Sequence, residues 1–131
     1  MTDQPHAICI DITGALREIP LGDTPRDQAR IVSRALLDAP AVIHRLDHPD
    51  GVIVIIGSKN RDQHQSNLYA SLLSRSLEGP VEDLHGPVVF AGVTSTDRLV
   101  SLPDRALAEA QKICAKASPA TCRDTNEKGT S

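Results

Sequence analysis

The sequence predicts a small α+β fold, in which an antiparallel or mixed sheet of about five or six strands carries three helices packed mainly on one face. Two apolar runs, residues 51–57 and 87–93, flank a segment with helical periodicity. A strand that is apolar on both sides must be covered on both sides or lie centrally in a sheet. The order strand–strand–helix also occurs three times along the chain. We therefore expect one domain over residues 1–117 and a disordered polar tail at 118–131.

The first two strands are expected to form a hairpin. Residues 7–12 and 16–21 have the apolar character of strands, and Thr13 and Gly14 between them are typical of a turn. Pro20 has no backbone N–H, so the second strand should lie at an edge of the sheet or end at that residue.

The first helix is predicted to begin after Thr24 and to end before Pro40. Thr24 can cap the helix, and Pro25 and Asp27 suit its first turn. The expected buried face recurs every three or four residues and consists of Ala29, Val32, Leu36 and Ala39. Another face carries three arginines spaced four apart, Arg26, Arg30 and Arg34. Such a stripe is usually the solvated side of a helix, although it can also meet an acidic partner.

The middle unit is a second hairpin followed by a helix. Residues 41–46 and 51–57 should pair antiparallel, because the turn at 48–51 has the sequence His-Pro-Asp-Gly. The next helix begins either at Ser66 or earlier at Asp62, and the sequence leaves both starts open. The apolar face of this helix consists of Leu68, Tyr69, Leu72, Leu73 and Leu77.

A third hairpin and helix complete the predicted domain. Residues 87–93 and 98–102 should pair across a turn at 94–97, and a last helix should begin at Pro103 and Asp104. The inward side of this helix consists of Leu107, Ala110, Ile113 and Cys114.

Composition argues against several function classes. Aromatic residues make up 2% of the chain, so nucleic-acid bases would find no stacking platform. The net charge of −3 also disfavours binding to phosphate backbones, which argues against nucleic acid as a partner. No apolar run approaches the roughly 18 residues of a membrane span, and the N-terminus lacks the pattern of a signal peptide. We therefore expect a cytoplasmic protein with no membrane contact.

One pair of histidines has the spacing of metal ligands. His44 and His48 would share a face of an extended strand, with Asp47 and Asp50 nearby. His48 and Asp50 also belong to the predicted turn, which has a structural reason of its own. We therefore expect no metal site and no cofactor, and His44 and His48 would be the ligands if a metal were bound.

The polar loop at 58–65 is the best candidate for a binding site. Ligands collect at the ends of strands, and helix N-termini attract anions. The residues that would contact a ligand or partner are Lys59, Asn60, Arg61, His64 and Asn67. A solvated connection is the competing interpretation, because the loop has no glycine-rich cradle. Asn67 could instead cap the helix and tie the loop to a neighbouring strand.

The sequence predicts no catalytic residues. No Gly-x-Ser-x-Gly turn marks a nucleophile, and none of the three cysteines has a neighbouring base in the sequence. Cys9 lies in a predicted strand and should be a small core residue. The spacing leaves open whether Cys114 and Cys122 form a disulfide.

Two motifs carry a resemblance to a known family. Residues 67–73 have the pattern Asn-x-x-Ala-x-x-Leu, and residues 84–92 contain a glycine followed by a valine-rich strand that ends in glycine. In these features the chain resembles small actinobacterial and bacteriophage proteins classed as domain of unknown function 3846. The resemblance covers residues 7–102, without the charged loop at 58–65. It implies a small accessory protein of a phage, plasmid or mobile element, with no established activity.

The functional hypothesis is a non-enzymatic accessory protein that binds another macromolecule. The expected contact is the loop at 58–64 or the arginine face of the first helix, and the expected partner is another protein. A homodimer also remains open. The alternative is a protein or enzyme that binds a small anionic ligand at the loop–helix junction of residues 58–67.

Overall fold

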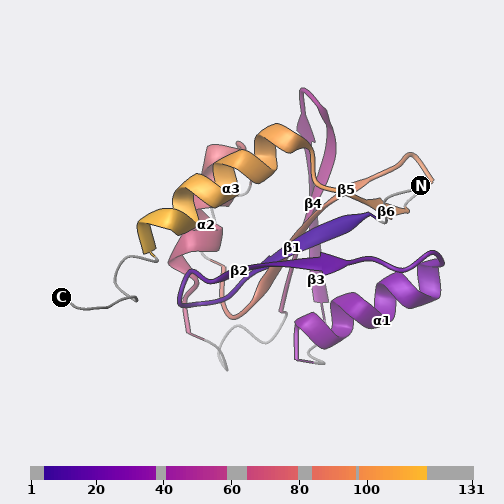
Figure 1. Cartoon of the computed structure of the whole chain (residues 1–131), viewed down its shortest axis with the longest axis horizontal. Helices are drawn as coiled ribbons and strands as arrows, with labels where there is room; N and C mark the ends of the chain where they lie inside the picture. Colours follow the sequence, from indigo (N-terminus) through magenta and orange to yellow (C-terminus); the bar gives the residue numbers. More distant parts are fainter. Residues whose placement is uncertain (1–4, 38–40, 59–64, 80–83, 97, 118–131) are drawn as a thin grey trace.

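A computed structural model describes residues 5–37, 41–58, 65–79, 84–96 and 98–117. Within these ranges the chain forms six strands and three helices, and the strand–strand–helix order occurs three times (Figure 1). The elements are β1 (His6–Ile10), β2 (Leu16–Pro20), α1 (Pro25–Ala35), β3 (Ala41–His48), β4 (Gly51–Ser58), α2 (Leu68–Ser76), β5 (Val88–Val93), β6 (Leu99–Val100) and α3 (Asp104–Ala117). The predicted α+β class is therefore confirmed.

All the strand pairs of the sheet are antiparallel, which decides between the two predicted sheet types. The strand order is β2-β1-β5-β4-β3, and β6 pairs with β5. Gly92 of β5 is opposite Ile53 of β4 on one side and Val100 of β6 on the other. Hence β6 lies along the same edge of β5 as β1. β2 and β3 form the two outer edges of the sheet.

Pro20 was expected to place its strand at an edge of the sheet or to end it, and the structure shows both, since β2 is an outer strand and ends at Pro20. The Leu21 N–H donates to the Pro5 carbonyl at 2.8 Å. Because hydrogen-bonded and non-hydrogen-bonded pairs alternate along an antiparallel ladder, residue 20 directs its backbone away from β1. The N–H that proline lacks would therefore have faced outward, where no strand needs it.

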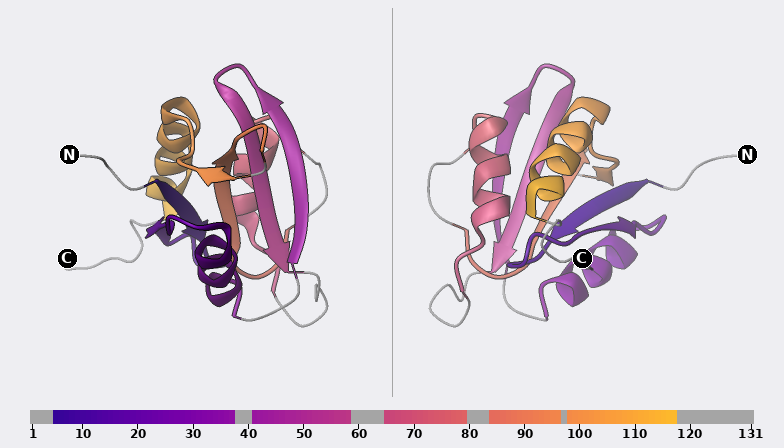
Figure 2. Two further views of the ribbon diagram at one scale, coloured as in Figure 1. Left: turned by 90° about the vertical axis from the view of Figure 1, so that its right-hand side faces the viewer. Right: turned by 60° about the vertical axis from the view of Figure 1, so that its left-hand side comes forward.

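The sheet is covered on both faces, as the doubly apolar strands require. α2 and α3 lie on one face and α1 on the other (Figure 2). Ile53 and Ile55 of β4 pack under α2 and α3, whereas Val54 and Ile56 of the same strand pack on the α1 side. Alternating side chains of one strand thus enter two separate cores. Two of the three helices share a face, in agreement with the predicted packing.

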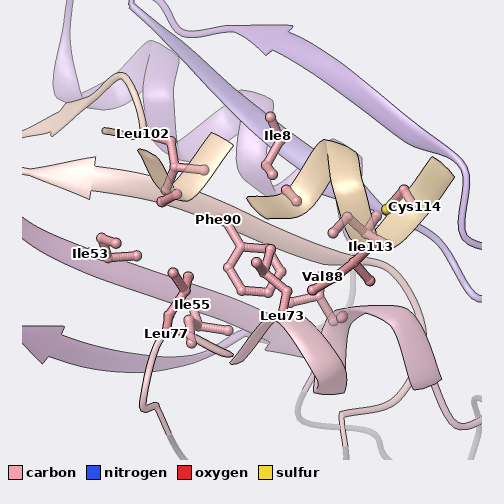
Figure 3. Close-up of a cluster of buried hydrophobic side chains, with 14 of the residues drawn as sticks. Ile8, Ile53, Ile55, Leu73, Leu77, Val88, Phe90, Leu102, Ile113 and Cys114 are labelled. Carbon is pink, nitrogen blue, oxygen red and sulfur yellow. The ribbon is translucent and has the colours of Figure 1, made fainter. Parts of the chain in front are cut away.

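Phe90 lies at the centre of the larger core (Figure 3). Its side chain is fully buried, and it is the only Phe in the chain. Aliphatic residues from the strands and both helices surround it, among them Ile8, Ile55, Leu73, Val88, Leu102 and Ile113. The predicted inward residues of α3 belong to this core or pack against its rim.

The first helix differs from its prediction at its end and on its buried face. It ends at Ala35, and Leu37 takes a positive φ of 59° that the helix cannot continue through. Ala29 is exposed, and its predicted place in the core is taken by Gln28 and Ala35. Val32 and Leu36 are buried as predicted, while Ala39 lies outside the described residues.

The second helix also begins later than predicted. Neither Asp62 nor Ser66 is its cap, since Asn67 occupies that position and the helix starts at Leu68. Of its predicted apolar face, Leu73 and Leu77 are buried, but Leu68 is 58% exposed and Leu72 is 40% exposed. The small residues Ala70, Ser71 and Ser74 are buried in their stead, which lets the helix lie close to the sheet.

Candidate functional site: an arginine-lined groove

A groove of about 710 Å³ lies between the edge strand β2 and helix α1. We call it the β2–α1 groove. Its lining residues, which include no carboxylate, are Arg17, Ile19, Pro20, Arg30, Ile31, Arg34, Ala35 and Leu37. The lining thus combines three arginines with aliphatic residues. The volume is in the range of ligand sites, although the groove is open to solvent on one side.

Helix α1 forms one wall of the groove because its first turn is tied to the sheet. The side-chain amide of Gln28 accepts a hydrogen bond from the Leu99 N–H at 3.0 Å and donates one to the Leu99 carbonyl at 2.9 Å. Gln28 is only 3% exposed and also donates to the Gly22 carbonyl at 3.3 Å. A buried amide with its polar atoms paired stabilises one arrangement of helix and strand.

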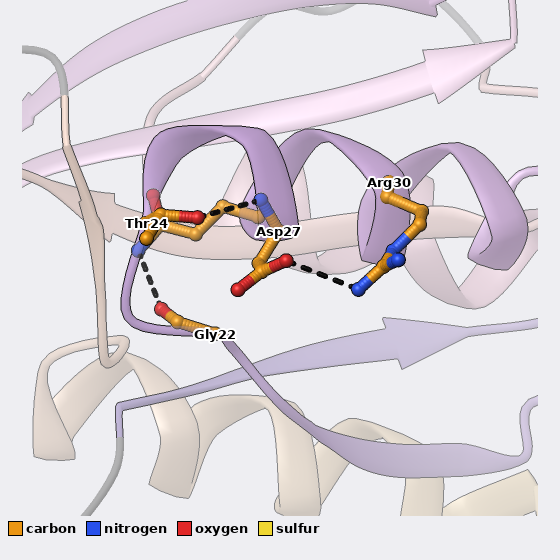
Figure 4. Close-up of polar contacts among 5 residues, drawn as sticks. Gly22, Thr24, Asp27 and Arg30 are labelled. Atoms are coloured by element: carbon orange, nitrogen blue, oxygen red, sulfur yellow. Dashed lines mark hydrogen bonds and ion pairs between the residues drawn. The ribbon is translucent and has the colours of Figure 1, made fainter.

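The helix start itself is tightly packed (Figure 4). Thr24 caps the helix by accepting from the Asp27 N–H at 3.1 Å, and Pro25 follows it in the first turn, as predicted. A Cβ at Gly22 would lie 2.4 Å from the Cβ of Asp27, so this close approach requires glycine. The turn from Gly22 to Thr24 therefore fixes where α1 begins relative to β2.

Among the described residues, the arginines of the groove have few partners, apart from a hydrogen bond between Arg17 and the Cys9 thiol. Arg30 pairs with Asp27 at 3.0 Å (Figure 4), but both side chains are well exposed, so this ion pair contributes little to stability. Arg34 and Arg17 are exposed from opposite walls. A guanidinium group presents five N–H donors in a planar fork that matches a carboxylate or a phosphate. The groove is therefore suited to hold an anion beside an apolar group.

Arg17 had not been singled out in the sequence. It is opposite Cys9 in the β1–β2 register, and that register places it on the α1 side of the sheet together with Ile19. Two observations in the sequence could have identified it, namely its alternation with Ile19 and its position in the strand that precedes the arginine helix. These two observations indicate a shared site only if α1 covers the face of the sheet that carries Arg17, and the sequence did not show this.

Of the five residues predicted to form a binding site at the loop, the structure describes one. Lys59, Asn60, Arg61 and His64 lie outside the described residues. Asn67 is described, and its side chain is fully buried. That burial contradicts a role for Asn67 in direct ligand contact.

Asn67 instead has the structural role that was its alternative. Its Oδ1 accepts from the Ala70 N–H at 3.0 Å, which caps α2. Its Nδ2 donates at 2.8 Å to the carbonyls of both Ile10 and Gly86. One side chain therefore joins the helix start to β1 and to the segment that leads into β5.

One of the two histidines considered as metal ligands, His48, has a structural explanation as well. His48 Nδ1 accepts from the backbone N–H of Asp50 at 3.1 Å and lies 3.9 Å from the carboxylate of that residue. Asp50 also lies 3.4 Å from Arg105 of α3. Among the residues that the structure describes, no group of three or more His, Cys, Asp or Glu could hold a metal ion. The His48 turn thus follows its structural interpretation.

Cys9 and Cys114 are both buried, and neither forms a disulfide with another described residue. Burial raises the pKa of the Cys9 thiol, and the hydrogen bond and charge of Arg17 only partly oppose this. Burial, together with the charge of Asp11, raises the pKa of Cys114. Neither thiol is activated as a nucleophile. Cys122 lies outside the described residues.

Comparisons with known proteins found no matching family model, no matching curated protein and no matching solved structure. The family resemblance of the two sequence motifs therefore stays a prediction. None of the helices in the described part of the chain is long and apolar enough to cross a membrane.

Proposed function

We propose that this chain is a non-enzymatic interaction protein that binds a partner protein through the β2–α1 groove. The observation that carries the proposal is the convergence of Arg17, Arg30 and Arg34 on an aliphatic surface in a chain of net charge −3. Positive charge concentrated on one face of an acidic protein favours an acidic partner and steers its approach. The arginine face of α1, recognised in the sequence, is one half of this surface.

The chemistry of the groove favours binding over catalysis. Guanidinium groups stay protonated at neutral pH, so they hold anions but do not act as general bases. The aliphatic residues that complete the lining cannot serve as nucleophiles. The two described cysteines are buried, with thiol pKa values raised by that burial. These properties suit a docking surface.

A partner protein fits the groove better than a nucleic acid. Ile19, Ile31 and Leu37 give the surface a large apolar share, and Leu37 is 68% exposed. Arginine is enriched at protein interfaces, and the buried centre of such interfaces is apolar. Nucleic-acid surfaces need a broader basic face than an acidic chain provides.

Affinity capture with charge-reversal variants tests this proposal. We expect Arg30→Glu with Arg34→Glu to reduce recovery of the partner at least about tenfold. The substitutions remove the charge attraction to an acidic partner and the hydrogen bonds that each guanidinium group would donate to its carboxylates. The matched control is Arg105→Glu with Lys112→Glu, which changes the net charge equally on exposed residues of α3. Equal recovery with all three proteins would overturn the proposal.

The loop at 58–64 can be tested in the same experiment. A third variant, Lys59→Ala with Arg61→Ala, removes the two cations of that loop. If this variant loses the partner while the α3 control retains it, the loop contributes to the same interface. Full recovery would restrict the interface to the groove.

A small anionic ligand is the second candidate, favoured by the groove volume of about 710 Å³. Thermal-shift measurements with nucleotides and phosphorylated metabolites distinguish it from the first candidate. A rise of several degrees with one ligand class, abolished by Arg30→Glu with Arg34→Glu, would favour the small ligand.

A further inference from the structure

We propose that the β2–α1 groove receives an extended acidic segment of the partner, which adds to the sheet as a new strand beside β2. This inference rests on the proposed function and names the kind of segment that the groove binds. It requires a free strand edge, side chains that point from that edge into the groove, and complementary charge.

The first requirement is met within the described part of the chain, where β2 is an outer strand whose one sheet neighbour is β1. The hydrogen-bonded pair formed by Leu21 and Pro5 sets the alternation along the ladder. Residues 17 and 19 therefore direct their backbone groups toward β1, and residues 16, 18 and 20 direct theirs outward. Since Pro20 has no N–H, an added strand would pair chiefly with the N–H and carbonyl of Glu18.

The second requirement concerns the side chains of the added strand. Arg17 and Ile19 of β2 lie on the α1 side of the sheet, in register with the buried residues Cys9 and Ala7. Alternate side chains of a neighbouring strand would point to the same side and enter the space in front of α1. There they would meet the exposed side chains of Arg30 and Arg34 and the aliphatic surface between them.

Charge then determines the composition of the segment. Residues at alternate positions of the segment should be acidic where they meet the arginines and aliphatic where they meet Ile19 and Ile31. A second copy of this chain is a poor occupant, because its own β2 would bring Arg17 against the arginines of the groove. The occupant is thus a separate chain with acidic and aliphatic residues alternating on one face.

Selection from a display library of random linear peptides tests the inference. The peptides retained by the whole protein should carry acidic and aliphatic residues at alternate positions. Selected peptides are then synthesised with and without N-methyl groups at alternate residues, which remove the donors that a strand would use. We expect N-methylation on the edge that faces β2 to weaken binding at least about tenfold, a loss of the size expected for strand hydrogen bonds.

A pair of protein variants tests the hydrogen bonds that β2 itself would make to the added strand. Glu18→Pro removes an N–H that faces away from β1, whereas Glu18→Ala keeps it and removes only the side chain. Binding of the selected peptides should fall at least about tenfold with Glu18→Pro and stay within about twofold with Glu18→Ala. Denaturant unfolding establishes that both variants are folded, and the N-methylated peptides give the answer if Glu18→Pro is not.

The outcomes separate the inference from the proposed function. If Arg30→Glu with Arg34→Glu abolishes partner capture but neither N-methylation nor Glu18→Pro weakens peptide binding, strand addition is overturned and the docking surface remains. If the arginine variant captures the partner as well as the native protein, the proposed function fails first. Selection of helical or basic peptides, or tighter binding of a single-stranded DNA oligonucleotide to the groove, would also overturn the inference.

Discussion

Gln28 pairs with Leu99 in the way that a neighbouring β-strand would. Its side-chain amide accepts from the Leu99 N–H at 3.0 Å and donates to the Leu99 carbonyl at 2.9 Å. The two residues are 71 positions apart in the chain. A guanidinium contact from Arg98 to the Asp23 carbonyl reinforces the same junction. The register with β5 directs the N–H and carbonyl of Leu99 away from β5, so this side chain pairs with the outer edge of β6.

Replacing Gln28 by leucine should therefore lower the free energy of unfolding, although the two side chains are of similar size. The Leu99 N–H and carbonyl would lose their partners in a partly buried place, which costs about 1–3 kcal/mol per unsatisfied group. Denaturant unfolding of Gln28→Leu measures the loss. Arg26→Leu on the exposed side of the same helix is the control, and an equal change in both variants would contradict the role of Gln28.

Asn67 has two roles that one substitution can separate, since its side chain caps α2 as an acceptor and donates hydrogen bonds to two carbonyls. Asn67→Asp retains an acceptor for the Ala70 N–H but replaces the donor to Ile10 and Gly86 by an oxygen facing two carbonyls. We expect this variant to lose at least about 2 kcal/mol of unfolding free energy at neutral pH, because it places an uncompensated charge in a buried site.

The stability of Asn67→Asp should also depend on pH. Burial beside carbonyls would raise the pKa of the new carboxyl above its unfolded value. A raised pKa in the folded state means that the protonated form is favoured, so stability is greatest below the unfolded pKa and falls as pH rises through the folded pKa. The difference in unfolding free energy between Asn67→Asp and the native protein should grow as the pH is raised from acid to neutral. A difference that does not change with pH would contradict the account.

Two glycines in strands provide a matched pair. A Cβ at Gly92 would lie 2.6 Å from the Ser101 carbonyl oxygen, whereas a Cβ at Gly57 would have no atom within 4 Å. We expect Gly92→Ala to cost about 1–3 kcal/mol through overpacking where β5 meets β6. Gly57→Ala should be neutral or stabilise by up to about 1 kcal/mol, because alanine restricts the unfolded chain. Thermal and denaturant unfolding measure both effects. A neutral Gly92→Ala together with a destabilising Gly57→Ala would contradict this explanation.

The buried thiols should react slowly while the protein is folded. Burial raises the pKa of both Cys9 and Cys114, so little thiolate is present at pH 8. Alkylation followed by peptide mass spectrometry should show both cysteines protected in the native protein and modified in denaturant. The raised pKa values also mean that the stability contributed by these thiols is complete below their unfolded pKa and is lost at more alkaline pH. Rapid native modification of either cysteine would contradict this assignment.

Much of the architecture could be predicted because local signals and hydrophobic pattern agree. The turns at Gly14 and Gly51, the doubly apolar strand β4 and the cap at Thr24 each indicated the element that the structure contains. Pro20 indicated that β2 lies at an edge or ends at that residue, and both are true of the structure. These features depend on neighbouring residues, so one sequence is sufficient to recognise them.

The remaining features depend on contacts between distant segments. Nothing local indicates that α1 covers the face opposite α2 and α3, and the β2–α1 groove exists only because of that placement. Gln28 interrupts the apolar face of its helix and gains meaning only from Leu99. The arginine stripe was visible in the sequence, but its meeting with Arg17 was not.

Amide hydrogen exchange of the captured complex tests the central claim most directly, because it reports which backbone groups the partner covers. The account predicts slower exchange over residues 16–20 and 30–37 when the partner is bound, with the outward-facing Glu18 N–H among the most protected. Exchange in α3 and β3 should stay unchanged. Protection confined to α3 or β3, with β2 and α1 exchanging as in the free protein, would contradict the claim that the β2–α1 groove is the binding surface.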